Sequence, residues 1–168
     1  MLNSEDFAAV RSQLGRDPRS VIDVAHRCSC GQPDVLKTSP RLDDGTPFPT
    51  LYYMTCPKAT GAIGTLEANG VMKELADALA ADPDLAASYE AAHQIYLQER
   101  EAIEHVEEIA GISAGGMPTR VKCLHVLIGH SLAAGPGVNP LGDIALAMLK
   151  DWGQTGPCGG EDNESGSN

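Results

Sequence analysis

VIDVAHRCSCGQPDVLKTSPRLDDGTPFPTLYYMTCP, residues 21–57, is the stretch from which the architecture of this chain is predicted. It contains three short runs rich in β-branched and aromatic residues, at 21–26, 34–38 and 51–55. Turn-forming Gly and Pro residues separate these runs, a pattern typical of short strands joined by turns and loops. The stretch therefore predicts a small antiparallel sheet of three strands.

Helical patterns lie on both sides of the predicted sheet. Residues 4–14 have apolar positions at helical spacing, and Gly15 is placed to end that helix. Asp82 and Pro83 are typical of the N-cap and the first position of a long helix. Helices are accordingly expected at residues 4–14, 57–69, 71–81, 83 to about 109, 118–134 and 143–152.

The chain is long enough for one hydrophobic core. Its 168 residues are 42% hydrophobic and 21% charged, which is ordinary for a folded globular protein. The predicted fold class is α+β, with a short N-terminal helix, a small three-stranded antiparallel sheet and a helical C-terminal half packed on it. We expect a single domain over residues 1–152, followed by a flexible acidic, Gly-rich tail over residues 153–168.

The net charge is −11, from 12 basic and 23 acidic side chains. An acidic excess of this size argues against general binding of DNA or RNA and against docking on anionic membranes. Residues 59–115 carry most of it, with two basic and eleven acidic side chains, which is typical of solvated helical faces. Residues 24–41 and 118–130 are each positive by two charges, so a small anion fits these regions.

Cysteine content and the N-terminal residues indicate the compartment. The five cysteines are an odd number, so they cannot all pair within one monomer. No stretch approaches the roughly 20 apolar residues that span a membrane. Residues 1–9 lack the basic region of a signal peptide. We therefore expect a cytoplasmic protein with reduced thiols and no membrane association.

Cysteine spacing suggests a zinc site. Cys28 and Cys30 are two residues apart, so on an extended strand their thiols point to the same face. Cys56 ends another predicted strand, and His125 would add an imidazole to the three thiolates, which completes the ligand set of a closed zinc site. The metal candidates are therefore Cys28, Cys30, Cys56 and His125, with zinc as the candidate cofactor. The alternative is that these cysteines are buried free thiols.

The segment RVKCLHVLIGH, residues 120–130, is predicted to lie on the helix over 118–134. On a regular helix Cys123 and His125 are about 200° apart around the axis. This helix is therefore expected to offer at most one ligand to any one metal ion. The alternative role for His125 is that of a core histidine satisfied by a buried hydrogen bond.

A cysteine-dependent enzyme acting on a small molecule is another hypothesis. Its catalytic candidates are Cys28, Cys123 and His125, because a histidine from another element activates a cysteine nucleophile. A neighbouring basic side chain such as Lys122 would lower the pKa of the thiol. The sequence leaves open whether the protein is an enzyme.

The leading hypothesis is a pocket between the sheet and the helical half that binds a small anionic, phosphate-bearing ligand. The loop over 39–50 contains three prolines and is typical of an ordered functional loop or, equally, of a structural clasp over the sheet. Tyr89, His93, Tyr96 and Arg100 recur at helical spacing and would form one wall of this pocket, or alternatively a buried seam. The candidate ligand-binding residues are Arg27, Arg41, Thr46, Tyr52, His93, Arg100, Arg120 and Lys122. The second hypothesis is a structural zinc module for protein–protein contact.

Several stretches carry a family resemblance: HRC at 26–28, DGTPFPTLYY at 44–53 with TCP at 55–57, AH at 92–93 up to Arg100, and RVKCLH at 120–125 up to His130. Together they resemble an actinobacterial family known as domain of unknown function 501, over roughly residues 5–150. The resemblance implies a bacterial cytoplasmic protein. It implies no particular activity and no catalytic or metal-binding residues, so the functional hypotheses rest on the residues discussed above.

Overall fold

The computed structural model describes residues 1–149 and 152, so the predicted tail over 153–168 lies outside the described residues. Three strands form one antiparallel sheet in the order β1-β2-β3. The three predicted strands are confirmed, and each end lies within one residue of its expected position. The strands are β1 (Val21–Arg27), β2 (Pro33–Thr38) and β3 (Tyr52–Met54).

Six α-helices and a short 3₁₀ helix accompany the sheet in the described part of the chain, which confirms the predicted α+β class. The structure confirms two helix ends that were predicted from Gly15 and Asp82. Gly15 has a left-handed backbone (φ 70°) and ends the first helix, and the Asp82 side chain accepts a hydrogen bond from the Asp84 amide at 3.0 Å. The helices are α1 (Ser4–Leu14), α2 (Pro57–Ala68), α3 (Val71–Ala81), α4 (Pro83–Glu101), the 3₁₀ helix (Glu107–Ile109), α5 (Leu124–Ala134) and α6 (Pro140–Ala147).

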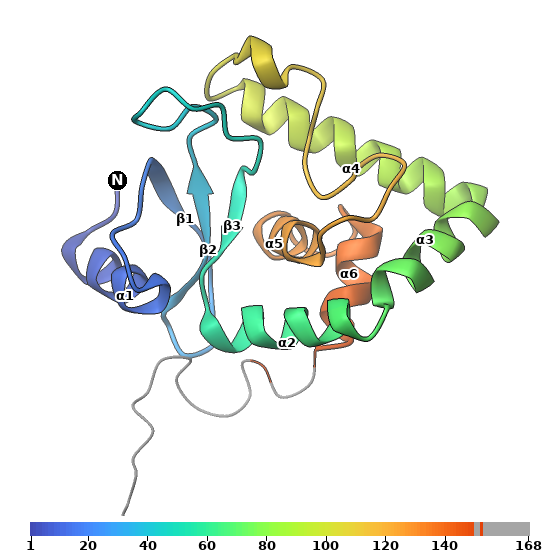
Figure 1. Cartoon of the computed structure of the whole chain (residues 1–168), viewed down its shortest axis with the longest axis horizontal. Coiled ribbons are helices and arrows are strands. Elements are labelled where there is room, and N and C mark those ends of the chain that lie inside the picture. Colours follow the sequence, from blue (N-terminus) through green and yellow to red (C-terminus); the bar gives the residue numbers. More distant parts are fainter. Residues whose placement is uncertain (150–151, 153–168) are drawn as a thin grey trace, which may run out of the picture.

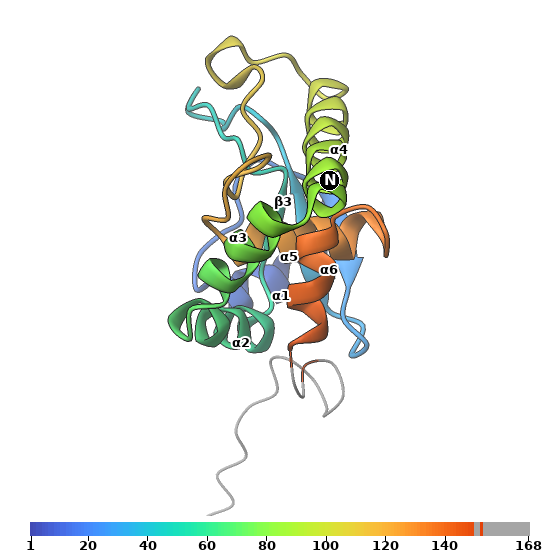
Figure 2. The same cartoon turned by 90° about the vertical axis from the view of Figure 1, so that its right-hand side faces the viewer.

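Helix α5 lies at the centre of the fold. Figure 1 shows it end-on, with the sheet on one side, α4 and α6 on the other, and α1 beyond the sheet. In Figure 2 the molecule is turned by 90°, and α6 lies in front of α5, with which it is in contact. Leu124, Leu127 and Ile128 of α5 are fully buried. Because α5 is apolar on most of its surface, it forms the middle of the hydrophobic core.

The sheet has two apolar faces, because successive strand residues point to opposite sides. Val35, Tyr52 and Met54 belong to the buried cluster that includes α5. Leu36 and Tyr53 are opposite each other in the register of β2 and β3 and point to the other face, toward α1. The helical half therefore covers only one face of the sheet.

Helices α4 and α6 differ from their predicted bounds. Helix α4 ends at Glu101 rather than near residue 109, because the chain folds back there and buries Val106 and Ile109. Helix α6 begins and ends earlier than the predicted helix at 143–152. The reason is that Asn139 is its N-cap, and the Asn139 side chain accepts a hydrogen bond from an amide of the first turn at 2.9 Å.

Helix α5 begins at Leu124, whereas the sequence pattern predicted a helix from residue 118. The residues before it form a loop, in which the Arg120 amide donates to the Gly116 carbonyl at 2.8 Å. Gly116 has a φ of 94°, and a Cβ atom on it would lie 2.8 Å from the Arg120 carbonyl oxygen. Only glycine fits this loop without strain. The prediction of a regular helix through Cys123 is therefore wrong.

One titratable side chain lies deep in the core. His130 on α5 is 0% exposed, and its ring stacks on Tyr52 and meets the Tyr96 ring edge-on. The side-chain amide nitrogen of Asn139 is 3.2 Å from His130 Nδ1. Because an amide NH₂ group only donates, His130 Nδ1 accepts this hydrogen bond and carries no proton. The imidazole is therefore neutral. Burial lowers the pKa of His130 to about 4.

We expect His130 to cost the folded state about 2–3 kcal/mol of stability when the pH falls from 7 to about 4.5. The pKa of a histidine in the unfolded chain is near 6.5, whereas that of folded His130 is about 4. The unfolded state therefore binds the proton first, and stability is lost as the pH falls below 6.5. Urea unfolding of the unchanged protein and of His130→Gln at both pH values measures this difference.

The comparison between the two proteins isolates His130 from other titrating groups. The His130→Gln variant should lose about 2–3 kcal/mol less than the unchanged protein over this pH interval. His105→Gln is a control with the opposite expectation. Glu107 and Glu101 raise the pKa of this exposed histidine, so its removal should not reduce the loss of stability on acidification. Equal losses in the unchanged protein and His130→Gln would contradict the prediction.

Candidate functional site

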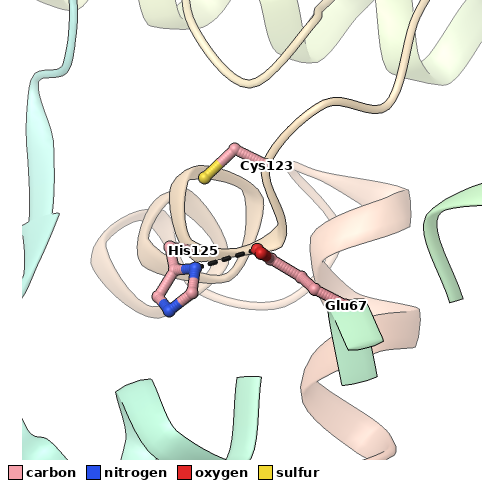
Figure 3. Close-up of side chains that lie close together, drawn as sticks. All are labelled: Glu67, Cys123 and His125. Carbon is pink, nitrogen blue, oxygen red and sulfur yellow. Dashed lines mark hydrogen bonds and ion pairs between the residues drawn. The ribbon is translucent and has the colours of Figure 1, made fainter. Parts of the chain in front are cut away.

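Glu67, Cys123 and His125 come together at the N-terminal end of α5 (Figure 3). Glu67 lies near the end of α2, Cys123 is the residue before α5, and His125 is in the first turn of α5. A carboxylate oxygen, the Cys123 Sγ atom and a ring nitrogen of His125 all lie within 4.8 Å of one another. Within residues 1–149 and 152, this is the only group of three or more potential metal ligands at such distances.

Hydrogen bonds from α2 hold the His125 ring on both sides. His125 Nδ1 is 2.9 Å from Glu67 Oε1, and the same oxygen accepts a hydrogen bond from the Leu124 amide at 3.1 Å. His125 Nε2 is 3.2 Å from the carbonyl oxygen of Thr60. Because a carbonyl only accepts, Nε2 carries a proton and donates it to Thr60. Figure 3 shows the Cys123 sulfur and the Glu67 carboxylate on the Nδ1 side of the ring.

The short distances within the group shift the pKa values of His125 and Cys123. Cys123, and after it Glu67, raise the pKa of His125 to about 9, although burial opposes this shift. Burial alone would raise the pKa of the Cys123 thiol. The His125 side chain and the Val126 amide outweigh burial, and the pKa of Cys123 lies below its usual value. The group therefore favours a positively charged His125 beside two acidic side chains.

The geometry corrects one expectation from the sequence. A regular helix would place Cys123 and His125 about 200° apart, but Cys123 has an extended backbone (φ −150°, ψ 111°) and lies outside the helix. Both side chains contribute to one group, so the expectation of at most one ligand from this segment is wrong. The sequence pattern does not distinguish Glu67 from the other acidic residues of the middle helices, which are usually solvated. The available signal is that Glu67 is the one acidic residue of α2.

The other predicted zinc ligands have different surroundings. Cys28 follows β1 and Cys56 is the N-cap of α2, and both are buried, whereas Cys30 is partly exposed. In the described part of the chain, these three cysteines do not join His125 in a group of ligand atoms within 4.8 Å. Of the catalytic candidates, Cys123 and His125 meet in one site, and Cys28 does not take part in it.

The predicted anion-binding residues are divided among separate contacts. Arg27 forms an ion pair with Asp6 at 2.7 Å, and Arg41 forms one with Glu108 at 2.9 Å. Both arginines therefore already have carboxylate partners. The exposed members of the predicted set are Thr46, Arg120 and Lys122, together with Arg27.

Three other members of that set are buried, namely Tyr52, His93 and Arg100. The Tyr52 hydroxyl donates to Glu99 at 2.7 Å, and His93 Nδ1 is 2.7 Å from Ser113 Oγ. Arg100 donates to backbone carbonyls. The predicted aromatic and basic stripe of α4 is buried throughout its length. These surroundings fit the alternative prediction, in which the stripe is a buried seam and not the wall of a pocket.

The fold and the site define the chain as an α+β protein in which a thiol, an imidazole and a carboxylate form one half-buried cluster. Residues 24–147 match the model of a family described as "Protein of unknown function (DUF501)", and the chain belongs to this family. The matched region includes all three residues of the group. Comparisons with curated proteins and with solved structures found no match. Among the described residues, no helix combines the length and the apolar character that crossing a bilayer requires.

Proposed function

We propose that this protein is a zinc-dependent enzyme in which Glu67, Cys123 and His125 bind one metal ion and leave one coordination position open. Carboxylate, thiolate and imidazole are the side-chain groups that bind zinc in proteins. The observation that carries the proposal is that their donor atoms lie within 4.8 Å of one another. Three protein ligands and an open fourth position are typical of catalytic zinc, whereas structural zinc has four protein ligands.

The hydrogen bond from His125 Nε2 to the Thr60 carbonyl supports metal binding. Metal-binding histidines usually donate the other ring N–H to a carbonyl or a carboxylate, which fixes the tautomer. With the proton on Nε2, the Nδ1 lone pair of neutral His125 is directed toward the side of the ring where Glu67 and Cys123 lie. The ring is therefore oriented for metal binding before a metal arrives.

The charge of the group also suits a divalent cation. Ionised Glu67 and Cys123 supply two negative charges, which a divalent cation neutralises when His125 is neutral. In the metal-free group a proton on His125 neutralises part of this negative charge, in accord with the raised pKa of His125, which is about 9. Zinc binding would therefore release protons.

Solvent reaches the site, which an enzyme requires. The side chains of Glu67 and His125 are 25% and 31% exposed. Zinc lowers the pKa of a bound water to roughly 7, which makes it a nucleophile at neutral pH. Metal-assisted hydrolysis is therefore the reaction class that we propose. The Leu124 amide, 3.1 Å from Glu67 Oε1, orients the carboxylate ligand.

Zinc binding by the purified full-length chain tests the proposal. After removal of metal with a chelator and reloading, we expect about one zinc ion per chain. Glu67→Gln, Cys123→Ser and His125→Gln should each weaken zinc binding roughly 100-fold or more, because each removes a ligand. Elemental analysis gives the stoichiometry, and competition with a chromophoric chelator gives the affinity. The zinc-loaded chain should also hydrolyse an activated chromogenic ester faster than the metal-free chain.

Two exposed residues provide matched controls for these substitutions. Glu74→Gln should leave zinc affinity unchanged, because Glu74 is exposed and lies outside the group. His105→Gln is the stricter control, because His105 contacts both Glu101 and Glu107 at the surface. A stoichiometry far below one zinc per chain, or equal affinities in the site and control variants, would contradict the proposal.

A cysteine nucleophile is a second use of the same residues, and the position of Cys123 favours it. The thiol lies at the N-terminal end of an 11-residue helix and beside a histidine, and both features stabilise a thiolate. Alkylation of Cys123 with and without zinc separates the two candidates. Bound zinc should protect the thiol, whereas a metal-free nucleophile should react equally in both samples and at a pH below ~8.5.

A further inference from the structure

A cavity lies on the sheet face that the helical half leaves uncovered. Its volume is about 370 Å³, and it is bounded by the residues after α1, by β2 and β3, and by the loop after β2. This volume is within the range of ~300–1,000 Å³ that small-molecule sites occupy. Leu14, the last residue of α1, lines the cavity, and α1 and α5 lie on opposite sides of the sheet (Figure 1). Cys123 and His125 are at the start of α5. The two sites are therefore separate.

The floor of the cavity is apolar. Leu36 of β2 and Tyr53 of β3 are direct partners in the sheet, and both line the cavity. Phe48 forms a side wall, and its ring centroid lies 6.4 Å from that of Tyr53 at an angle of 46°. Two aromatic rings and a leucine provide a surface for a flat or aliphatic hydrocarbon group.

The polar part of the wall is positively charged. Arg16 and Arg19 line the cavity, and none of the described residues around it is acidic. The neighbouring Arg11 forms an ion pair with Asp17 at 3.1 Å. Arg16 instead donates to the backbone carbonyl of Asp17 at 3.3 Å, and neither Arg16 nor Arg19 forms a salt bridge with a described residue. Arg19 acts on the exposed carboxyl of Asp44 through its charge. Two guanidinium groups are thus available to an anion in the cavity.

We infer that this cavity binds a small apolar carboxylate. Its hydrocarbon part would pack on Leu36, Phe48 and Tyr53, and its carboxylate would accept hydrogen bonds from Arg16 and Arg19. Guanidinium groups match the planar geometry of a carboxylate and bind it with two parallel hydrogen bonds. A neutral ligand would gain no attraction from the positive charge of the two arginines. A highly charged ligand would bury its charges against the apolar floor.

The test compares 1-naphthoate with its neutral analogue 1-naphthalenemethanol, each titrated calorimetrically into the full-length chain. We expect 1-naphthoate to bind at one site and at least 10-fold more tightly than the alcohol, because it alone pairs with the arginines. The Arg16→Gln/Arg19→Gln double variant should weaken naphthoate binding by about 10- to 100-fold and leave binding of the alcohol unchanged.

Two further variants and a metal control complete the test. Arg120→Gln is the matched control, because Arg120 is an exposed arginine outside the cavity, and naphthoate should bind it as it binds the unchanged chain. Val21 also lines the cavity, so Val21→Trp should fill the space and abolish binding of both ligands. Chelator-treated chain should bind naphthoate normally, which separates this inference from the zinc proposal. Equal affinity for naphthoate and the alcohol, or unchanged naphthoate affinity in the double arginine variant, would overturn the inference.

Discussion

Replacement of Arg100 with methionine is expected to lower the free energy of unfolding by about 4 kcal/mol. Arg100 lies on α4 and is only 1% exposed, although it is a charged residue. Its guanidinium group donates to the Pro49 carbonyl at 2.9 Å, and to the carbonyls of Ile109 and Ile112 at 2.8 and 2.5 Å. Methionine would keep the packing of the stem and leave these three carbonyls without their donor. The hydrogen bond to Ile109 is buried and the other two are partly buried. A buried carbonyl that loses its partner costs about 1–3 kcal/mol.

Urea unfolding monitored by circular dichroism measures this loss. Arg120→Met is the matched control, because Arg120 is exposed and surface substitutions usually change stability by less than about 0.5 kcal/mol. Arg100→Lys is informative as well, since one ammonium cannot reproduce the planar fork that reaches three carbonyls, and it should restore only part of the stability. A loss below about 1 kcal/mol in Arg100→Met would show that the carbonyls find other donors.

Replacement of Gly142 with alanine is expected to destabilise the protein by about 3 kcal/mol. Gly142 lies on α6 where this helix packs closely on α5. A Cβ atom at this position would overlap with the Leu127 carbonyl oxygen and the Ser131 hydroxyl, and would lie 2.8 Å from the Leu127 carbonyl carbon. The nearest of these atoms, the Leu127 carbonyl oxygen, belongs to the backbone of α5 and cannot rotate away. The two helices must therefore move apart to admit a methyl group.

Gly61→Ala provides the opposite expectation in the same fold. Gly61 lies on α2, and a Cβ atom on it would meet no atom of the described residues within 4 Å. Alanine has the higher helix propensity, so this variant should gain about 0.5–1 kcal/mol. The two variants make the same chemical change, and unfolding free energies of opposite sign are the expected result. Gly142→Ala with unchanged or increased stability would contradict the close approach of α5 and α6.

The elements that local signals determine were predictable from the sequence. The alternating β-branched and aromatic residues place the three strands, and Gly15, Pro57 and Asp82 place helix ends through backbone geometry and capping. These preferences act over a few residues, so they depend little on how the rest of the chain is packed. The helix pattern failed at Cys123, because the loop before α5 depends on Gly116 and its close contact with Arg120.

Candidate residues were predictable in type, but their partners were not. The sequence pointed to Cys123 and His125 as candidates, and it placed them on opposite sides of a helix. It also marked Arg27, Arg41 and Arg100 as candidates for an anion, whereas these side chains contact Asp6, Glu108 and backbone carbonyls respectively. A positive side chain in a sequence shows only that hydrogen-bond acceptors or water must surround it. Folding decides whether those acceptors belong to the same chain.

The sequence by itself therefore determined the fold class and most element bounds. It offered His125 as a metal ligand and Cys123 as a catalytic candidate, but it placed the two on opposite sides of a helix. Only the tertiary structure decided that Glu67 joins them, since its contact with His125 links residues 58 positions apart. It also decided that Arg16 and Arg19 line a cavity on the open face of the sheet. The physical reason is that backbone preferences are local, whereas the packing of α2 on α5 and of α1 beside the sheet depends on apolar surfaces contributed by the whole chain.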